Sequence, residues 1–413
     1  MADTDLALER GSPVRTTPFP APGPDVEPED GELVAEIARS GHLWRVDGTH
    51  VNGLEAAFAE LHGVPAERVV ASTSGTAALH LAVGAVNPEP GDEIIVPPIT
   101  DFGTVIPVLA QNAVPVFADV RPNTFCIDPE SVVQRLSPRT RAIVAVHLFG
   151  QPCDMDALGE IARARGIALI EDCAQAPLAE YRGRTVGTLG DYGCFSLQQS
   201  KHITAGEGGL TIVRDQGRAE WARLFADKGW PRSGGERTHL FLGMNYRMPE
   251  IQGAIARKQL GRLPQNLERR RANAAMLDAA MAGLPGIQVP QPPAGVRSSY
   301  WMYPFRVHER AAEFARAVRG EGIPLASGYV RPLYLVPALR ERRTYGNSGF
   351  PFDSPYARPQ PPFEPGLCPV AEGAAEHLCY LAWHQHITPV DVQDVAAAIA
   401  KVARAFARRY GWS

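Results

Sequence analysis

The sequence has few cysteines, and those it has are scattered. Six occur among 413 residues. None forms a Cys-x-x-Cys pair or a cluster with histidine, which argues against a disulfide-stabilised secreted domain and against a zinc site. His384 and His386 likewise lack a matching pattern of carboxylate or cysteine ligands. We therefore expect a reduced protein without a metal centre.

Long apolar runs and an excess of one charge are also missing. The run from Ala142 to Phe149 suits a strand, whereas a membrane helix needs about 18 apolar residues. Asp3, Asp5 and Glu9 stand where a secretory signal would carry basic and then apolar residues. Lys and Arg total 41 against 45 Asp and Glu, which gives no electrostatic basis for binding nucleic acid. We expect a cytoplasmic protein that binds neither membranes nor nucleic acid.

The composition that remains is that of a folded protein with a large core. Hydrophobic residues make up 45% of the chain, and its length allows two or three domains. Residues 1–30 differ, because they hold six prolines and little apolar periodicity. Such a segment cannot bury enough apolar surface to fold alone. We predict an extended N-terminal arm over residues 1–30.

Strands and helices are predicted to alternate through the first half of the chain. Helical patterns cover Gly53–Gly63, Ala77–Val86 and Met155–Arg165. Short apolar runs predict buried strands at Val69–Ala71, Ile94–Val96, Val114–Phe117, Ala142–Val146 and Ile167–Ile170. Alternation of this kind predicts an α/β fold with a mostly parallel sheet covered on both faces.

The pattern changes after about residue 250. A long helical stretch, Glu250 to Ala279, leads into proline-rich connections and a strand-like segment, Trp301–Val307. The chain ends in a helix with Thr388 as N-cap and Pro389 at its first position. We predict a large α/β domain over residues 31–262 and a smaller C-terminal α+β domain over residues 263–413.

A lysine lies in the most distinctive segment, residues 195–209. Lys201 follows a strand-like run and precedes the glycine-rich turn Gly206-Glu207-Gly208-Gly209. A lone lysine between polar residues is usually a solvated surface residue. On a constrained loop beside a ligand, however, it can lose its proton and form a Schiff base with a carbonyl.

Two further segments lie where a predicted strand ends. Ile167–Ile170 is followed by Glu171 and Asp172, at the carboxyl edge where open α/β sheets bind ligands. Asp172 could cap the next turn, or it could hold a heteroaromatic nitrogen in its protonated form. The stretch Ser72–Leu79 joins a strand to a helix and could bind phosphate at the helix start, although such a sequence is more often only a cap.

These segments resemble those of one enzyme family. Ser74–Leu79, Glu171–Ala176, Ser196–Gly209 and Gly243–Met248 are similar to the corresponding segments of the DegT/DnrJ/EryC1/StrS family of sugar and cyclitol aminotransferases, which depend on pyridoxal 5′-phosphate (PLP). The resemblance runs from about Leu54 to the final helix. It implies the PLP-dependent transferase fold of type I, with a seven-stranded sheet in the large domain.

The resemblance also implies roles for individual residues. Lys201 would form the Schiff base with PLP and then move the proton, and Asp172 would pair with the pyridine nitrogen. Gln175 would contact the ring hydroxyl. The phosphate would be held by Ser74, Gly75, Thr76 and Ser196, and by Asn245 from the neighbouring subunit of a homodimer with shared active sites.

One stretch departs from the family pattern. Asp101 stands where an aromatic residue usually stacks on the pyridine ring, so we expect either that Phe102 stacks in its place or that the ring is covered differently. Trp44, Arg45, His202 and Lys228 are candidate substrate contacts. Tryptophan faces suit sugar C–H groups, although tryptophans more often serve cores and interfaces.

The resemblance implies an aminotransferase. Glutamine or glutamate would convert the cofactor to pyridoxamine 5′-phosphate, and a keto-sugar or keto-cyclitol would then take the amino group. The pair Gln198-Gln199 favours cyclitols, as in aminoglycoside pathways. Two alternatives stay open: a PLP-dependent sugar dehydratase, oxidase or epimerase, and a non-catalytic PLP-binding regulator. Lys201 argues against the dehydratases, which carry histidine at this position. The sequence shows no nucleic-acid-binding module, which argues against the regulator.

Overall fold

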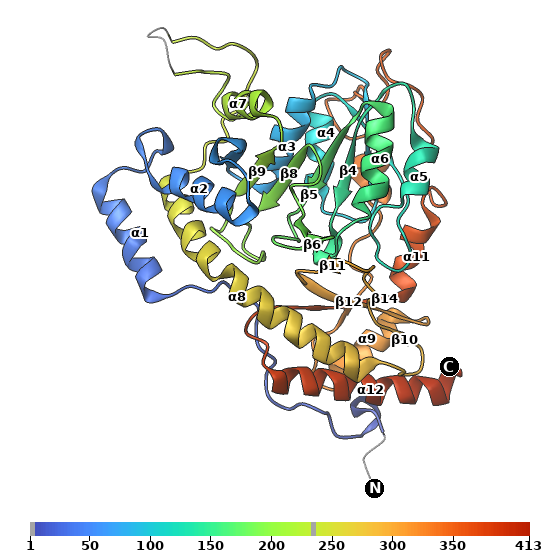
Figure 1. Ribbon diagram of the computed structural model, residues 1–413. Coiled ribbons are helices and arrows are strands. Elements are labelled where there is room, and N and C mark those ends of the chain that lie inside the picture. The colour runs from blue at the N-terminus through green and yellow to red at the C-terminus, as the bar shows by residue number, and fades with distance from the viewer. Residues whose placement is uncertain (1–4, 233–236) are drawn as a thin grey trace.

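The computed structural model describes residues 5–232 and 237–413 of the chain. A large sheet with its helices forms one end of the molecule, and a smaller sheet resting on the C-terminal helix forms the other (Figure 1). One long helix, α8 (Glu250–Met281), runs from the first part to the second. None of the helices in the described ranges is long and apolar enough to cross a membrane.

The large sheet has seven strands in the order β1-β9-β8-β5-β4-β2-β3. They are β1 (Val69–Ser72), β2 (Glu93–Val96), β3 (Val114–Phe117), β4 (Thr140–Val146), β5 (Ala168–Asp172), β8 (Tyr192–Ser196) and β9 (Gly209–Val213). β9 is antiparallel to β1 and β8, and the other neighbours pair in parallel. Every residue of β1, β2, β3 and β9 is buried, so both faces are covered. The predicted fold class is confirmed.

Helices pack on this sheet as the alternating pattern predicts. α3 (Gly75–Val86) packs against β8 and β9, and α6 (Met155–Arg165) packs against β4 and β5. α3 begins at Gly75 because the Ser74 Oγ accepts a hydrogen bond from the Ala77 N–H at 3.0 Å, which caps the first turn. The other helices of this part are α2 (His50–His62), α4 (Ile106–Ala110), α5 (Pro129–Arg135) and α7 (Gln216–Phe225).

The smaller part is built on an antiparallel sheet of order β10-β12-β14-β13. Its strands are β10 (Ile287–Gln288), β12 (Met302–Val307), β13 (Ala326–Ser327) and β14 (Leu378–Ala382), and its main helices are α9 (Ala311–Gly320) and α12 (Pro389–Tyr410). Alternate residues of β12 are buried, as expected for a sheet covered on one face. α12 starts at the predicted cap, where the Asp391 carboxylate also accepts from the Thr388 N–H at 2.8 Å.

Short elements complete the chain. A three-stranded sheet joins β11 (Val296–Arg297), β6 (Glu180–Tyr181) and β7 (Arg184–Thr185). The remaining α-helices are α1 (Pro28–Ser40), α10 (Pro337–Arg340) and α11 (Pro369–His377). The 3₁₀ turns are Ala7–Glu9, Arg45–Asp47, Ala66–Arg68, Phe102–Thr104, Leu148–Gly150 and Leu333–Leu335.

The boundary between the two parts falls within α8. Leu263 and Leu267 belong to the core of the large sheet, whereas Ala274 and Leu277 belong to the core of the smaller one. The sequence predicts a domain boundary between residues 262 and 263, and α8 runs across it without a break despite Pro264. Core membership changes a few residues later than that boundary.

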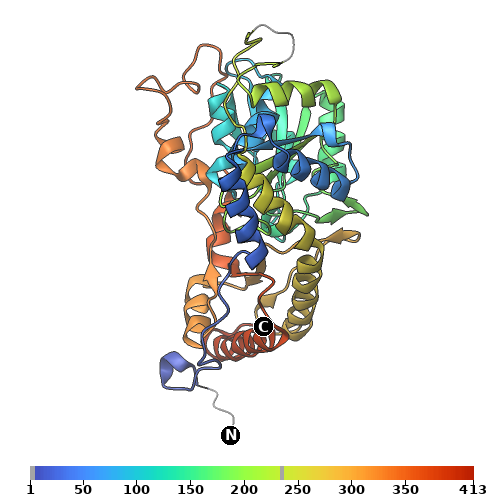
Figure 2. The same ribbon diagram turned by 90° about the vertical axis from the view of Figure 1, so that its left-hand side faces the viewer.

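The described part of the N-terminal arm lies against the smaller part before it reaches α1 (Figure 2). The buried Glu321 carboxylate accepts from the Ala7 N–H at 2.9 Å and from the Val14 N–H at 3.2 Å. Arg15 forms an ion pair with Asp391 at 2.7 Å. These contacts fix a segment that has little apolar surface of its own.

Candidate active site

The sheet topology brings the three predicted segments to one edge. β1, β5 and β8 run in the same direction, so their carboxyl ends share an edge of the sheet. Ser74 follows β1, Asp172 ends β5 and Ser196 ends β8. Together with Lys201 they line a cavity of about 370 Å³. A cavity of this size is typical of small-ligand sites.

The start of α3 provides a close-fitting wall for an anion. A Cβ atom added to Gly75 would lie 2.7 Å from the Cβ of Ser196 and 2.9 Å from its Oγ, so only glycine lets the first turn approach this side chain. The first N–H groups of a helix have no acceptor within the helix and carry its positive dipole end. The Thr76 and Ser196 side chains line the cavity beside them. This arrangement fits a phosphate group.

Asp172 is a buried carboxylate fixed by two donors. One oxygen accepts from the Thr104 hydroxyl at 2.8 Å, and the other accepts from the Ala174 N–H at 3.1 Å. Burial raises the pKa of Asp172, although both hydrogen bonds lower it. A positively charged nitrogen opposite this carboxylate would favour its ionised form. The site therefore fits a protonated heteroaromatic ring.

The Lys201 amine lies against an aromatic ring. Its Nζ is 4.0 Å from the centre of the Trp301 ring. Burial lowers the pKa of Lys201, while the negative charges of Asp172 and Asp101 raise it. A lowered pKa increases the fraction of neutral amine, which is the nucleophilic form. Lys201, Asp172 and the start of α3 thus line one cavity that suits PLP.

Two residues predicted to contact the cofactor of their own chain do not line the cavity. The buried Gln175 side chain accepts from the Phe149 N–H at 2.6 Å and donates to the Tyr329 hydroxyl at 3.1 Å, so it reaches the cavity only through Tyr329. Phe102 lies half-buried against the core of the large sheet. Asp101 caps the turn Phe102–Thr104 by accepting from the Gly103 N–H at 2.7 Å, which leaves Asp101 and not Phe102 on the cavity wall.

The candidate substrate residues lie outside this cavity. Arg45 pairs with Glu55 at 2.7 Å. His202 is buried, and its Nε2 donates to the Ser299 carbonyl at 2.9 Å; burial lowers its pKa well below the usual value. The Arg232 guanidinium lies 4.8 Å from the ring centre of the exposed Trp44, and Lys228 lies 5.7 Å from that of Trp230.

Asn245 is exposed and does not line the cavity of its own chain. It forms a β-bridge with Asp227, whose carboxylate pairs with Arg232 and Arg247. Within one chain, Asn245 therefore takes no part in lining the cavity that holds Lys201.

Three residues of the site carry no signal that the predicted motifs contain. Trp301 and Tyr329 line the cavity, and Thr104 holds Asp172. Thr104 lies three residues after Asp101, in the stretch that departs from the family pattern, and this departure is a signal from which it could have been found. Trp301 and Tyr329 lie about a hundred residues or more after Lys201 and carry no local motif.

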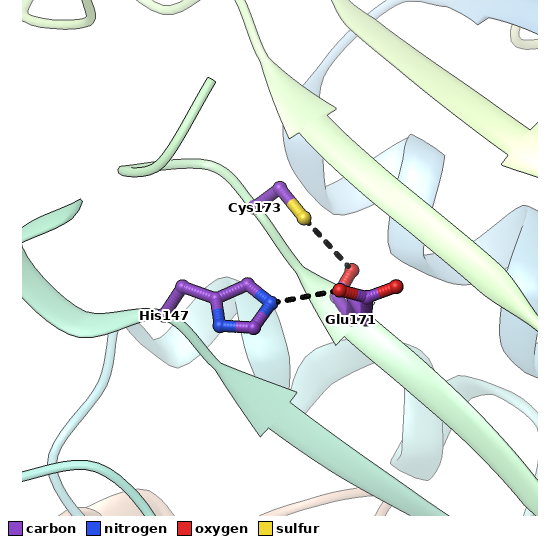
Figure 3. A group of neighbouring side chains, drawn as sticks. All are labelled: His147, Glu171 and Cys173. Carbon is purple, nitrogen blue, oxygen red and sulfur yellow. Dashed lines mark hydrogen bonds and ion pairs between the residues drawn. The ribbon is translucent and has the colours of Figure 1, made fainter. Parts of the chain in front are cut away.

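One cluster of potential metal ligands is present in the described ranges, but its atoms are already bonded. His147, Glu171 and Cys173 lie close together, and all three are buried (Figure 3). The His147 Nδ1 accepts from the Cys153 N–H, so its Nε2 carries the proton and donates to Glu171 at 3.0 Å. Glu171 also accepts from the N–H groups of Gly187, Leu189 and Gly190. These bonds explain the cluster as a support for the loop before β8.

The fold and the cavity together define an aminotransferase of the PLP-dependent type. The chain belongs to the DegT/DnrJ/EryC1/StrS aminotransferase family, whose family model matches residues 24–354. Aminotransferases of this family use PLP. The predicted family and enzyme class are confirmed.

Individual relatives agree with this assignment. The chain is 38% identical to L-glutamine:2-deoxy-scyllo-inosose aminotransferase from Streptomyces fradiae over 426 aligned positions, which cover 97% of each chain. Among solved structures, it is similar to the aminotransferase TlmJ from Streptoalloteichus hindustanus, with a TM-score of 0.80 and 33% identity over 94% of this chain and 99% of that one. It is also similar to 3-amino-5-hydroxybenzoic acid synthase, with a TM-score of 0.84 and 28% identity over 95% of this chain and all of that one.

Proposed function

We propose that this enzyme transfers the α-amino group of L-glutamine to a keto-cyclitol of the 2-deoxy-scyllo-inosose type, with PLP as cofactor. The observation that carries the proposal is the single cavity that joins Lys201, Asp172 and the start of α3. The name of the Streptomyces fradiae relative supplies the substrate pair. When bound, PLP supplies an electron sink for negative charge at the carbon next to the transferred nitrogen.

The residues of this chain would divide the work. Gly75, Thr76 and Ser196 would hold the phosphate, and Asp172 would hold positive charge on the ring nitrogen. Lys201 would attach the cofactor and then accept and return the proton at the reacting carbon, a role that a lowered pKa supports. Trp301 and Tyr329 would exclude water from that side of the cavity.

The polarity of the cavity favours a neutral polyol over a nucleotide-linked sugar. Among the described residues that line it, Lys201 is the only basic one, whereas Asp101, Asp172 and Glu207 are acidic. A nucleotide-linked sugar carries a diphosphate, which proteins usually bind through arginine, lysine or helix N-termini. Asp101, Gln198, Ser200 and Glu207 offer hydrogen-bonding groups to the hydroxyls of a cyclitol ring.

An isotope-transfer experiment tests this function. The PLP-loaded enzyme is incubated with 2-deoxy-scyllo-inosose and L-glutamine labelled with ¹⁵N at either the α-amino or the amide nitrogen, and mass spectrometry follows the label. We expect ¹⁵N in the aminocyclitol only from the α-labelled donor, with 2-oxoglutaramate as co-product. Transfer to a nucleotide-linked keto-sugar but not to the cyclitol would contradict the proposed substrate.

We also propose a homodimer in which Asn245 contacts the phosphate of the partner's site. If so, Lys201→Ala and Asn245→Asp variants should each be inactive but should regain activity when reassociated. The first chain lends a sound Asn245 to the site whose Lys201 comes from the second, so each heterodimer should contain one sound site. Activity of the mixture is measured against each variant treated alone.

Failure of this complementation has a definite meaning. If native mass spectrometry detects heterodimers and no activity returns, Asn245 and Lys201 of different chains do not act in one site, and the shared-site arrangement is wrong.

A further inference from the structure

A short segment just before β12 ties together the parts of the candidate active site. We call Ser298–Trp301 the clamp segment. The Ser298 hydroxyl donates to the Gly150 carbonyl at 2.9 Å, and the Ser299 hydroxyl donates to the Gln175 carbonyl at 3.2 Å. The Trp301 N–H donates to the Phe149 carbonyl at 2.9 Å. The clamp segment is therefore fixed to the loops that follow β4 and β5.

The clamp segment also holds both sequence neighbours of Lys201. The Trp301 Nε1–H donates to the Ser200 carbonyl at 2.7 Å. On the other side, the His202 Nε2–H donates to the Ser299 carbonyl at 2.9 Å. The chain is thus held by the Ser200 carbonyl immediately before the lysine and by the His202 side chain immediately after it.

The third contact involves the amine itself. The Lys201 Nζ lies 4.0 Å from the Trp301 ring centre, within the range of a cation–π interaction. The Tyr329 ring packs edge-on to Trp301, with 6.3 Å between ring centres, and both rings line the cavity. The indole therefore limits where the amine can lie and covers one side of it from water.

We propose that Trp301 is the positioning residue for Lys201. Its Nε1–H fixes the lysine loop, residues 197–206, at Ser200, and its ring face sets the position of the Nζ atom. This inference rests on the proposed role of Lys201 as the reacting amine. It concerns the protein without cofactor, in which Lys201 already lines the cavity.

The lysine content of the chain allows a direct test. Lys201, Lys228, Lys258 and Lys401 are its only lysines. Reductive methylation with ¹³C-formaldehyde therefore gives four dimethyl-lysine signals, which Lys→Arg variants assign. Nuclei above an aromatic face resonate upfield, so in the cofactor-free wild type we expect the Lys201 signal upfield of the other three. Hydrogen exchange of residues 197–206 and PLP affinity are measured alongside.

Two variants separate the two contributions of Trp301, and a third tests the charge beside Lys201. Trp301→Phe keeps a ring face but loses the bond to Ser200; we expect an upfield Lys201 signal, faster exchange confined to residues 197–206, and about tenfold weaker PLP binding. Trp301→Leu should in addition lose the upfield shift. Asp101→Asn should keep the shift but lower the pH at which Lys201 titrates, because it removes a negative charge that raises the pKa of this amine.

Trp221→Phe is the matched control. Trp221 is half-buried and stacks on Phe225 and Phe241, away from the lysine loop. It should leave the Lys201 signal and the exchange of residues 197–206 unchanged. An unshifted Lys201 signal in the wild type, or an upfield signal that survives Trp301→Leu, would overturn the proposal, as would faster exchange spread over the whole chain in Trp301→Phe.

The result of this test can be distinguished from a failure of the proposed function. The signals and exchange rates are measured without substrate or cofactor, so they report on Trp301 even if the enzyme fails to aminate a cyclitol. A wild type that shows the upfield signal but binds no PLP would contradict the function and leave the positioning intact.

Discussion

Replacing Lys201 by alanine is expected to give a folded protein with no detectable amino transfer. The side chain lines a cavity and is not part of either apolar core, so its loss should not unfold the chain. Loss of the proton transfer alone costs about 10²–10⁴-fold in rate. Losing the covalent attachment of PLP adds to this cost. The rate of ¹⁵N transfer and the thermal unfolding temperature are the measurements.

Lys258→Ala is the matched control for this prediction. Lys258 is exposed on α8, and its loss should leave the transfer rate unchanged. In the wild type loaded with PLP, borohydride reduction followed by peptide mapping should find the cofactor's mass on the peptide that contains Lys201. Finding that mass on the peptide of Lys228, Lys258 or Lys401 would refute the assignment.

The parts of the site that the sequence predicts are those that lie in local motifs. Ser74–Thr76 and Asp172 follow or end strands that apolar runs identify, and Ser196 ends the strand-like run before Lys201. Parallel strands place their carboxyl ends at one edge, so the alternation of strands and helices already implies that these residues meet. The start of α12 is also predicted from a local signal, because Thr388 is its N-cap and Pro389 its first residue.

Contacts between distant segments escaped prediction, because no local pattern encodes them. Trp301 reaches Ser200 only because the clamp segment folds back onto the loops after β4 and β5. The partner of Arg45 is Glu55 on α2, and nothing in the spacing distinguishes this ion pair from a substrate contact. For His202, the sequence gives its place beside Lys201 but not that its side chain is buried beneath the loop.

Phe102 shows how a single substitution changes a local prediction. An aromatic residue at position 101 would face the cavity. Aspartate there caps the following turn through the Gly103 N–H, so the next side chain lies against the core instead. Trp301 and Tyr329 are the aromatic rings on the wall of this cavity among the described residues. The predicted stacking by Phe102 therefore gains no support from its position.

The second large effect is expected at Asp172. Asp172→Asn keeps the shape of the side chain and an oxygen that can accept from the Thr104 hydroxyl or the Ala174 N–H. It removes the negative charge that would stabilise a protonated ring nitrogen. Breaking a buried charge pair by neutralising one partner costs about 3–5 kcal/mol, which corresponds to roughly 10²–10⁴-fold in rate if the charge acts in the transition state.

Two other variants of the same cavity calibrate this loss. Asp101→Asn also removes a carboxylate from the wall, but Asp101 is exposed and solvent screens its charge, so we expect a much smaller loss of rate. Thr104→Val removes one of the two hydrogen bonds that lower the pKa of Asp172 and should fall between the two. The measurements are single-turnover rates of the PLP-loaded variants with L-glutamine, together with PLP affinity. If Asp172→Asn reacts at nearly the wild-type rate, the carboxylate serves only to end β5, and the proposed placement of the cofactor ring is wrong.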